Sequence, residues 1–314
     1  MTRESSGLKV QYELRPHKQV ERRMLLDAFH LLSLAGFPIV DYQYTGLGSF
    51  YFVDFILFHK LLGIDRLLSI ERSVKHRNRV EFNKPFDCVE IHVGEASEVI
   101  PNLDRALKHI LWLDYDEILN NEMLEDVRSA AACLGAGSVL LVTVDVEPPG
   151  EPQDGPDEWR AHFESQATTY LPANPEPTYF SQSNLVHVNL DLFDRAISAG
   201  LGPRTGIAFT PLFNFLYADT HQMLSVGGMI TTDSEAALVD SSLLRRAIYF
   251  RPSFNTPPYE IRVPNLTRRE RLYLDANMPC AAGWTPPDFE VGVDEVASYR
   301  EIYRFFPAYA ELLL

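Results

Sequence analysis

The stretch PIVDYQYTGLGSFYFVDFILFHKLLGIDRLLSIE, residues 38–71, carries the clearest fold signal in the chain. A short β-type run at 38–45 meets the turn GLGS at 46–49, an apolar helical run follows at 50–62, and a second strand, RLLSIE, lies at 66–71. Both strands have few alternating polar positions, which indicates burial on both faces, as in a parallel sheet. The stretch therefore predicts a β-α-β unit with a right-handed crossover.

The same alternation continues along the next part of the chain. Further strands are expected at 88–93, 110–115 and 138–146, and helices at 18–35, 72–83, 94–109 and 117–135. Five short apolar strands separated by helices are typical of an α/β protein with helices on both faces of its sheet. The predicted fold is a doubly wound, Rossmann-like sheet.

The regular pattern stops at Glu147, where EPPGEPQDGPDEWR is rich in proline, glycine and acidic residues. Such a composition indicates a surface loop that leads into an insertion, which we place at about 147–184. A helix near Leu185–Ala199 closes it, and late elements of the same sheet are expected at 205–219 and 225–233.

The chain is accordingly divided into three parts. They are an N-terminal arm and helix at 1–35, an α/β domain with its insertion at 36–262, and a C-terminal extension packed on that domain at 263–314.

Composition narrows the function classes. The 314 residues include 28 Lys and Arg against 43 Asp and Glu, a formal charge of −15, and this acidity argues against a general nucleic-acid or anionic-membrane binder. Cys88, Cys133 and Cys280 are scattered, which excludes a disulfide framework and a CxxC zinc site. The N-terminal residues lack the apolar core of a signal peptide, and the longest charge-free stretch, Ser129–Val144, is interrupted by two glycines. We expect a cytoplasmic protein without a membrane partner.

Candidate ligand-binding residues stand at the ends of the first four predicted strands, where ligands of doubly wound sheets bind. The first is the segment Tyr44-Thr45-Gly46-Leu47-Gly48-Ser49, whose glycines allow a ligand to approach the backbone closely. Glu71 ends the second strand and is placed to accept hydrogen bonds from the ribose hydroxyls of an adenosine-containing ligand. Gly94-Glu95-Ala96 and Leu113-Asp114-Tyr115-Asp116 follow the third strand and close the fourth. Each segment taken alone is also compatible with an ordinary turn or helix cap.

As an ordered series, these segments resemble the landmarks of class I S-adenosylmethionine-dependent methyltransferases, and most of all the O-methyltransferases within that superfamily. The resemblance covers residues 36–146 well and 185–262 loosely. It implies S-adenosylmethionine as the cofactor. The residues that it implies in binding are Tyr44, Gly46, Gly48 and Ser49 around the methionine portion, Glu71 on the ribose with Arg72 beside the adenosine, Gly94, Glu95 and Ala96 around the adenine, and Asp114 facing the reactive methyl.

Transfer of a methyl group to a hydroxyl needs positioning and a base. Asp114 and Asp116 are the candidate catalytic residues, since repulsion between close carboxylates would raise a pKa toward the range of a base. The segment DYDE differs from the DPPY and NPPF motifs of nucleic-acid base methylation, and Val146 stands where a metal-dependent enzyme would carry Asn. We therefore predict O-methylation without a metal. The acceptor is unidentified, a small molecule being preferred over protein or RNA.

Two departures from the superfamily pattern support an alternative function. Tyr44 replaces the usual acid before the glycines, and Phe50 replaces the third glycine. The alternative is a catalytically silent methyltransferase-like binding or sensor subunit of a larger complex. An NAD-dependent oxidoreductase is disfavoured, because its third glycine would fall at Tyr51.

Three further features have two interpretations each. Arg15 and Lys18 are either part of a solvated helix face or fold over the cofactor cleft. The apolar C-terminal run at 305–314 covers either its own sheet or a partner. The aromatic residues of the insertion either form the acceptor pocket or hold the insertion on the sheet; they are Trp159, Phe163, Tyr170, Tyr179 and Phe180.

Overall fold

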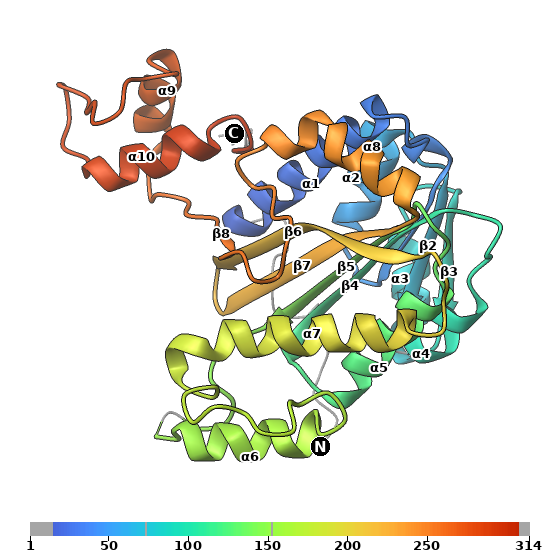
Figure 1. Ribbon diagram of the computed structural model, residues 1–314. Helices are drawn as coiled ribbons and strands as arrows, with labels where there is room; N and C mark the ends of the chain where they lie inside the picture. Colours follow the sequence, from blue (N-terminus) through green and yellow to red (C-terminus); the bar gives the residue numbers. More distant parts are fainter. Residues whose placement is uncertain (1–14, 73, 152, 308–314) are drawn as a thin grey trace.

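The computed structural model describes residues 15–72, 74–151 and 153–307, and it shows an eight-stranded sheet in the order β3-β2-β1-β4-β5-β7-β6-β8 (Figure 1). The strands are β1 (Gln43–Leu47), β2 (Arg66–Glu71), β3 (Val89–Val93), β4 (His109–Ile118), β5 (Val139–Asp145), β6 (Ala208–Ala218), β7 (Gln222–Thr231) and β8 (Tyr259–Glu260). The first five strands are mutually parallel, and β7 runs antiparallel between β5 and β6. The predicted doubly wound α/β sheet is thereby confirmed.

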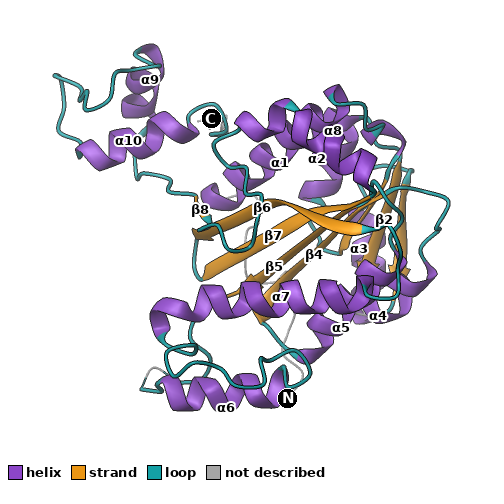
Figure 2. Ribbon diagram, viewed as in Figure 1, coloured by secondary structure: helices purple, strands orange, loops and turns teal. Residues whose placement is uncertain are grey.

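Helices cover both faces of this sheet (Figure 2). They are α1 (Pro16–Leu34), α2 (Val53–Leu62), α3 (Arg77–Asn83), α4 (Ala96–Val99), α5 (Asn121–Cys133), α6 (Pro156–Gln166), α7 (Leu185–Leu201), α8 (Asp233–Ser241), α9 (Arg268–Ala276) and α10 (Val293–Ile302). One face carries α1, α2 and α8, and the other carries α5 and α7 with α6 outside α7 (Figure 1). Each face has its own buried apolar cluster. We call them the α1 face and the α7 face.

The chain enters the sheet at its centre and then builds outward in two directions. β1 pairs with β2 on one side and with β4 on the other. The strand order therefore reverses beside β1, and such a switch point is where doubly wound sheets bind ligands, beyond the carboxyl ends of the strands.

Strand β7 fits between its neighbours because it carries two consecutive glycines. A Cβ on Gly227 would overlap the side chain of Leu141 in β5, and one on Gly228 would overlap the backbone oxygen of Thr210 in β6. The sequence GG thus permits the close packing of the reversed strand.

The C-terminal part leaves the sheet after β8, and α9 and α10 stand apart at the upper left of Figure 1. Its connection to the α1 face is partly apolar, since Ile302 belongs to that cluster and the Phe305 ring contacts Tyr249. The Tyr259 hydroxyl also donates a hydrogen bond to Glu301. Part of the expected C-terminal apolar run, 308–314, lies outside the described residues.

Two local predictions were wrong. The run at 38–45 becomes a strand only from Gln43, since Ile39–Asp41 forms a 3-10 turn. The helix expected from position 117 begins at Asn121, because β4 continues through a bulge and pairs Ile118 with Asp145 of β5. Asn120 caps the helix by accepting a hydrogen bond from the Met123 amide, so neither Asp114 nor Asp116 does so.

A third prediction was too long. The helix expected at 94–109 is reduced to α4 and a 3-10 turn at Ile100–Asn102. None of the helices in the described part of the chain has the length and apolar character that crossing a bilayer requires.

Candidate functional site

The ends of β1, β2 and β3 meet through main-chain hydrogen bonds. The Gly48 amide donates to the Ile70 oxygen at 2.6 Å, and the Gly94 amide donates to the Glu71 oxygen at 3.1 Å. Three of the predicted positions, Gly48, Glu71 and Gly94, are therefore neighbours at the carboxyl edge of the sheet.

Polar atoms of β2 lie close to Gly48. A Cβ at this position would lie 2.8 Å from Oε2 of Glu71 and 3.0 Å from Oγ of Ser69. The Ser69 hydroxyl is buried and has no hydrogen-bond partner among the described residues. A side chain at position 48 would overlap these atoms, so glycine is what allows the Glu71 carboxylate to lie directly against the turn. This arrangement fits the ribose-binding role that the resemblance implies for Glu71.

The predicted adenine segment has a structural role of its own. Glu95 caps α4 in a capping box with Glu98, and its carboxylate lies 3.0 Å from Nε of Arg72. Arg72 and Glu95 are both more than half exposed in their side chains, whereas Ala96 is buried on the α7 face. Arg72 and Glu95 thus form a solvent-exposed ion pair next to Glu71.

Tyr44 and Gly46 lie inside β1 and not in the turn. The Tyr44 ring is 2% exposed and meets Phe55 and Phe58 edge-on at 4.9 and 4.6 Å between ring centroids. Its hydroxyl folds over Gly46, where a Cβ would lie 2.5 Å from Oη. The missing side chain of Gly46 therefore makes room for Tyr44 in the core. Both residues were expected to bind the methionine portion of the cofactor from the turn, and this expectation does not fit their positions inside the strand.

A buried group of charges lies next to this edge of the sheet on the α1 face. We call it the Lys18 cluster; it consists of Lys18, Glu21, Arg22, Asp54, Asp114 and Tyr217. Nζ of Lys18 lies 2.6 Å from Asp114 and 3.0 Å from Glu21, and it donates to the Tyr217 hydroxyl at 3.1 Å. It also lies 4.4 Å from the centre of the Trp112 ring. Lys18 is 1% exposed and packs against the end of β4, so it does not belong to a solvated helix face.

Arg22 connects the same helix to the segment after the glycine turn. Its Nε donates to Oδ1 of Asp54 at 2.5 Å, and Asp54 lies in the first turn of α2. Helix α1 thus contacts β4, which is the neighbour of β1 in the sheet, and α2, which follows the turn at 48–52.

The pKa of Asp114 differs from the expectation. Burial opposes ionisation of this carboxyl, but the charges of Lys18, Arg22 and Arg15 outweigh burial and lower its pKa. Repulsion from Asp116 does not raise it, because Asp116 points into solvent while Asp114 faces Lys18. Asp114 is accordingly an ionised partner of Lys18 and is poorly suited to accept a proton.

The net shift of the pKa is opposite for Glu21, whose side chain is fully buried. Loss of solvent raises the pKa of Glu21, and the nearby Lys18 only partly offsets this. Sequence reasoning missed Glu21, Asp54 and Tyr217. The available signal was the spacing of Lys18, Glu21 and Leu25, which places the charges on the same face as the apolar residues of α1.

The aromatic residues of the insertion are all buried on the α7 face. Phe163 stacks on Phe180 at 5.9 Å, and the hydroxyls of Tyr170 and Tyr179 donate to Glu125 and Asp191 at 2.5 and 2.7 Å. These rings attach the insertion to the domain, which supports the packing interpretation.

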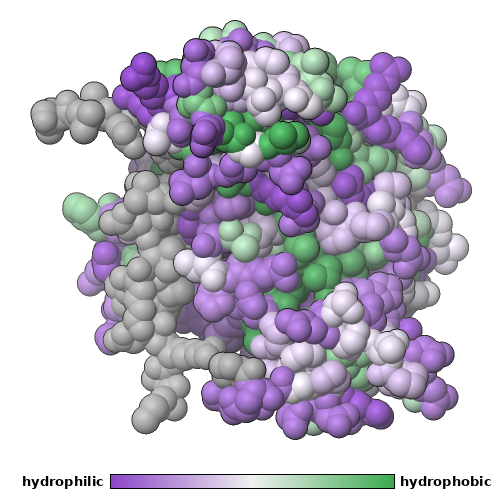
Figure 3. All heavy atoms as spheres, turned by 90° about the vertical axis from the view of Figure 1, so that its left-hand side faces the viewer, coloured by the Kyte–Doolittle hydropathy of each residue, from purple (hydrophilic) through white to green (hydrophobic). Residues whose placement is uncertain are grey.

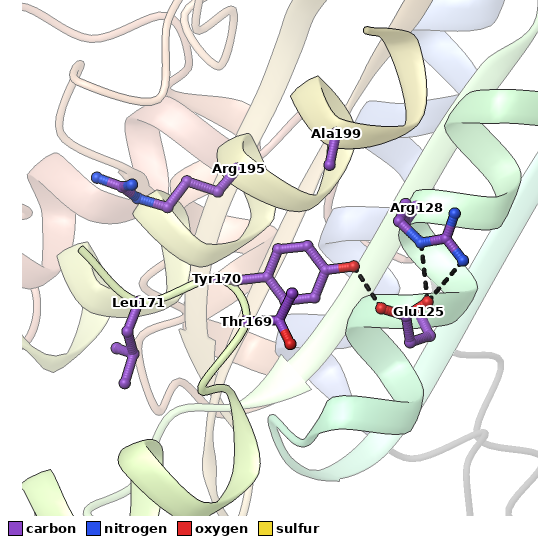
Figure 4. A pocket seen from close by; sticks show the side chains of 7 residues that line it. All are labelled: Glu125, Arg128, Thr169, Tyr170, Leu171, Arg195 and Ala199. Carbon is purple, nitrogen blue, oxygen red and sulfur yellow. Dashed lines mark hydrogen bonds and ion pairs between the residues drawn. The ribbon is translucent and has the colours of Figure 1, made fainter. Parts of the chain in front are cut away.

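One surface hollow of about 310 Å³ lies between α5, α7 and residues 169–171 (Figure 4). The Tyr170 hydroxyl and Arg128 both point toward Glu125 there, and Arg195 and Ala199 project from α7. None of the predicted cofactor-binding or catalytic residues lines it, whereas Tyr170, one of the aromatic residues of the insertion, does. The side view in Figure 3 is mostly polar, with apolar side chains in a few narrow bands.

The fold is that of a doubly wound α/β protein, and Gly48, Glu71 and Gly94 meet at the carboxyl edge beside its switch point. The chain belongs to a methyltransferase family: the family model described as "Putative O-methyltransferase" matches residues 10–314. The predicted enzyme class, a methyltransferase, and S-adenosylmethionine, the cofactor predicted with it, agree with this family.

Solved structures with a similar arrangement are distant in sequence. Trm1 from Pyrococcus horikoshii with S-adenosyl-L-methionine is 12% identical, with a TM-score of 0.43; the match covers 73% of this chain and 58% of that chain. The O-methyltransferase TomG from Streptomyces achromogenes is 18% identical, with a TM-score of 0.35; the match covers 72% of this chain and 93% of that chain. A protein from Klebsiella pneumoniae described as a "putative O-methyltransferase" is 12% identical, with a TM-score of 0.36; the match covers 72% of this chain and 94% of that chain. A search of curated protein sequences found no match.

Proposed function

We propose that this protein is an S-adenosylmethionine-dependent methyltransferase that methylates a hydroxyl of a small-molecule acceptor. The observation that carries the proposal is the Glu71 carboxylate beside the side-chain-free Gly48 at the carboxyl edge of the sheet. Family membership across residues 10–314 supports the reaction class. The formal charge of −15 disfavours RNA as the acceptor.

In this proposal the Gly48–Ser49 backbone approaches the methionine portion and the Glu71 carboxylate accepts hydrogen bonds from the ribose hydroxyls. Gly94 and Ala96 lie toward the adenine, and the Arg72–Glu95 pair forms the rim. The bound cofactor supplies an activated sulfonium methyl group, so the protein has mainly to position the acceptor oxygen in line.

The proton of the acceptor hydroxyl requires a base at the end of β4. We assign Asp116 to this role, because its carboxylate is exposed at the strand end and is not held by Lys18. Asp114 is a positioning residue, since its ion pair with Lys18 joins β4 to α1.

The test of the cofactor site is calorimetric titration of S-adenosylmethionine and S-adenosylhomocysteine into wild type, Glu71→Ala and Glu90→Ala. Glu90 is an exposed glutamate within β3, away from the carboxyl edge, and serves as the matched control. We expect Glu71→Ala to weaken binding at least tenfold, because hydrogen bonds to a charged group contribute about 1.5–3 kcal/mol. Absence of binding by folded wild type would refute the proposal.

The test of turnover is release of S-adenosylhomocysteine with a panel of hydroxylated small molecules. Asp116→Asn should lower kcat by about 10²-fold or more while leaving the dissociation constant of S-adenosylmethionine unchanged. Tight cofactor binding without turnover of any acceptor, small molecule, protein or RNA, would instead identify a silent binding subunit.

A further inference from the structure

Three segments far from the methyltransferase site converge on one imidazole nitrogen. Nδ1 of His59, in the last turn of α2, lies 3.0 Å from the backbone oxygen of Ile64 and 3.2 Å from Oδ1 of Asp65. Sγ of Cys88, directly before β3, lies 3.7 Å from the same nitrogen. An imidazole nitrogen, a carboxylate, a thiol and a carbonyl oxygen therefore surround one small volume.

This group has more acceptors than protons to share among them. Nδ1 carries at most one hydrogen, which can point toward only one of the three surrounding atoms. The Cys88 thiol adds at most one weak donor. A cation in the position of the Nδ1 proton would instead attract all four atoms at once.

The distances from Nδ1 are close to the edges of a metal-centred tetrahedron: the distance to Sγ falls in the expected range and the two distances to oxygen are slightly shorter. Bonds from zinc to nitrogen and oxygen are about 2.0–2.2 Å and to sulfur about 2.3 Å, which gives ligand-to-ligand separations of about 3.3–3.7 Å. The three distances from Nδ1 are 3.0, 3.2 and 3.7 Å, and the three side-chain ligand atoms all lie within 4.8 Å of one another. We propose that His59, Asp65 and Cys88 bind a zinc-type divalent cation, with the Ile64 carbonyl oxygen as the fourth ligand.

The donor set selects among metals. Thiolate and imidazole are ligands of zinc and of similar transition-metal ions, whereas Mg²⁺ and Ca²⁺ require oxygen ligands. Access is open, because the side chains of His59 and Asp65 are 28% and 78% exposed.

The position of this site gives it a structural role. Asp65 and Cys88 precede β2 and β3, so the cation would lie at the amino edge of the sheet, whereas Glu71 and Gly94 lie at the carboxyl edge. A bound ion would join the end of α2 to the starts of two strands without reaching the methyl-transfer site. The proposal therefore stands or falls independently of the proposed function.

The test uses the reduced, metal-free full chain and titrates Co²⁺ by absorption and Zn²⁺ by calorimetry. We expect one equivalent to bind and Co²⁺ to produce a thiolate charge-transfer band in the near ultraviolet. Cys88→Ser should abolish that band, while Cys133→Ser, a substitution of another half-buried cysteine, should retain it. Excess Mg²⁺ should not compete.

A second measurement separates ion binding from misfolding. Zn²⁺ should raise the Tm of wild type by a few degrees but leave that of Asp65→Asn unchanged. Asp65 is largely exposed, so this variant should fold and should bind S-adenosylmethionine as wild type does. The proposal is overturned if folded wild type shows no saturable binding, or if Cys88→Ser and Cys133→Ser give the same cobalt spectrum.

Discussion

The two faces of the sheet accommodate polar atoms in opposite ways. On the α1 face, Lys18, Glu21 and Arg22 are at most 2% exposed and find their partners inside the protein. On the α7 face the core is mainly apolar, with Asp126 and Asn189 as buried polar side chains of α5 and α7, and the hydroxyls of Tyr170 and Tyr179 reach outward to carboxylates nearer the surface. The α7 face therefore depends mainly on apolar packing, which tolerates change, whereas the α1 face depends on each charge keeping its partner.

The largest effect is expected from Lys18→Met, which tests the α1 face. The variant leaves Asp114 and Glu21 without their cation in a buried position, and we expect the free energy of unfolding to fall by about 3–5 kcal/mol. Chemical denaturation monitored by circular dichroism measures this. Arg160→Met removes one partner of an exposed ion pair with Glu164 and should leave stability unchanged. Equal losses in the two variants would contradict the contrast between buried and exposed charges.

A smaller effect, which depends on pH, is expected from Asp219→Asn. Burial opposes ionisation of Asp219, but hydrogen bonds from His17 and the charge of Arg15 outweigh burial and lower its pKa. Because the folded state favours the ionised form, the stability that it adds is present above the unfolded pKa of about 3.9 and is lost as pH falls through the folded pKa.

We expect Asp219→Asn to reduce the free energy of unfolding by about 2 kcal/mol at neutral pH. The difference from wild type should shrink below about pH 5. Denaturation curves of both proteins, recorded from pH 7 down to the lowest pH at which they still fold, measure the size of the loss and its dependence on pH. A difference that stays constant with pH would mean that the ionised carboxylate has no special role.

The smallest effect is expected from Tyr179→Phe on the α7 face. The ring remains packed against Phe180, and only the hydrogen bond to the partly exposed Asp191 is lost. We expect a loss of about 1 kcal/mol, measured by the same denaturation experiment. A loss as large as that of Lys18→Met would show that the α7 face also depends on specific polar contacts.

The sequence predicted the strands well because their signal is local. Runs such as RLLSIE and SVLLVTVDV are apolar and short, and turns bound them. The start of α5 was misplaced because it depends on pairing with another strand. Residues 115–118 extend β4 only because β5 offers Asp145 opposite Ile118, which no local pattern reveals.

The candidate site was predicted in part for the same reason. Gly48 and Glu71 stand at the ends of strands, and parallel strands bring such ends together. The strand β1 continues to Leu47, two residues beyond the predicted end at position 45, so Tyr44 and Gly46 lie inside the strand, and the Tyr44 ring packs against Phe55 of α2. The His59, Asp65 and Cys88 group has no motif spacing, so only the folded chain brings it together.

Two polar partners of helix α1 lie about two hundred residues away along the chain. Lys18 and Tyr217 are separated by 199 positions, and His17 and Asp219 by 202. During synthesis the helix is made first, yet its charges have no complete set of partners until β6 has emerged from the ribosome. Contacts of such long sequence separation form slowly. We therefore expect the contacts of α1, and with them the final alignment of β4, to be completed late in folding, which would link assembly of the candidate site to completion of the distant half of the chain.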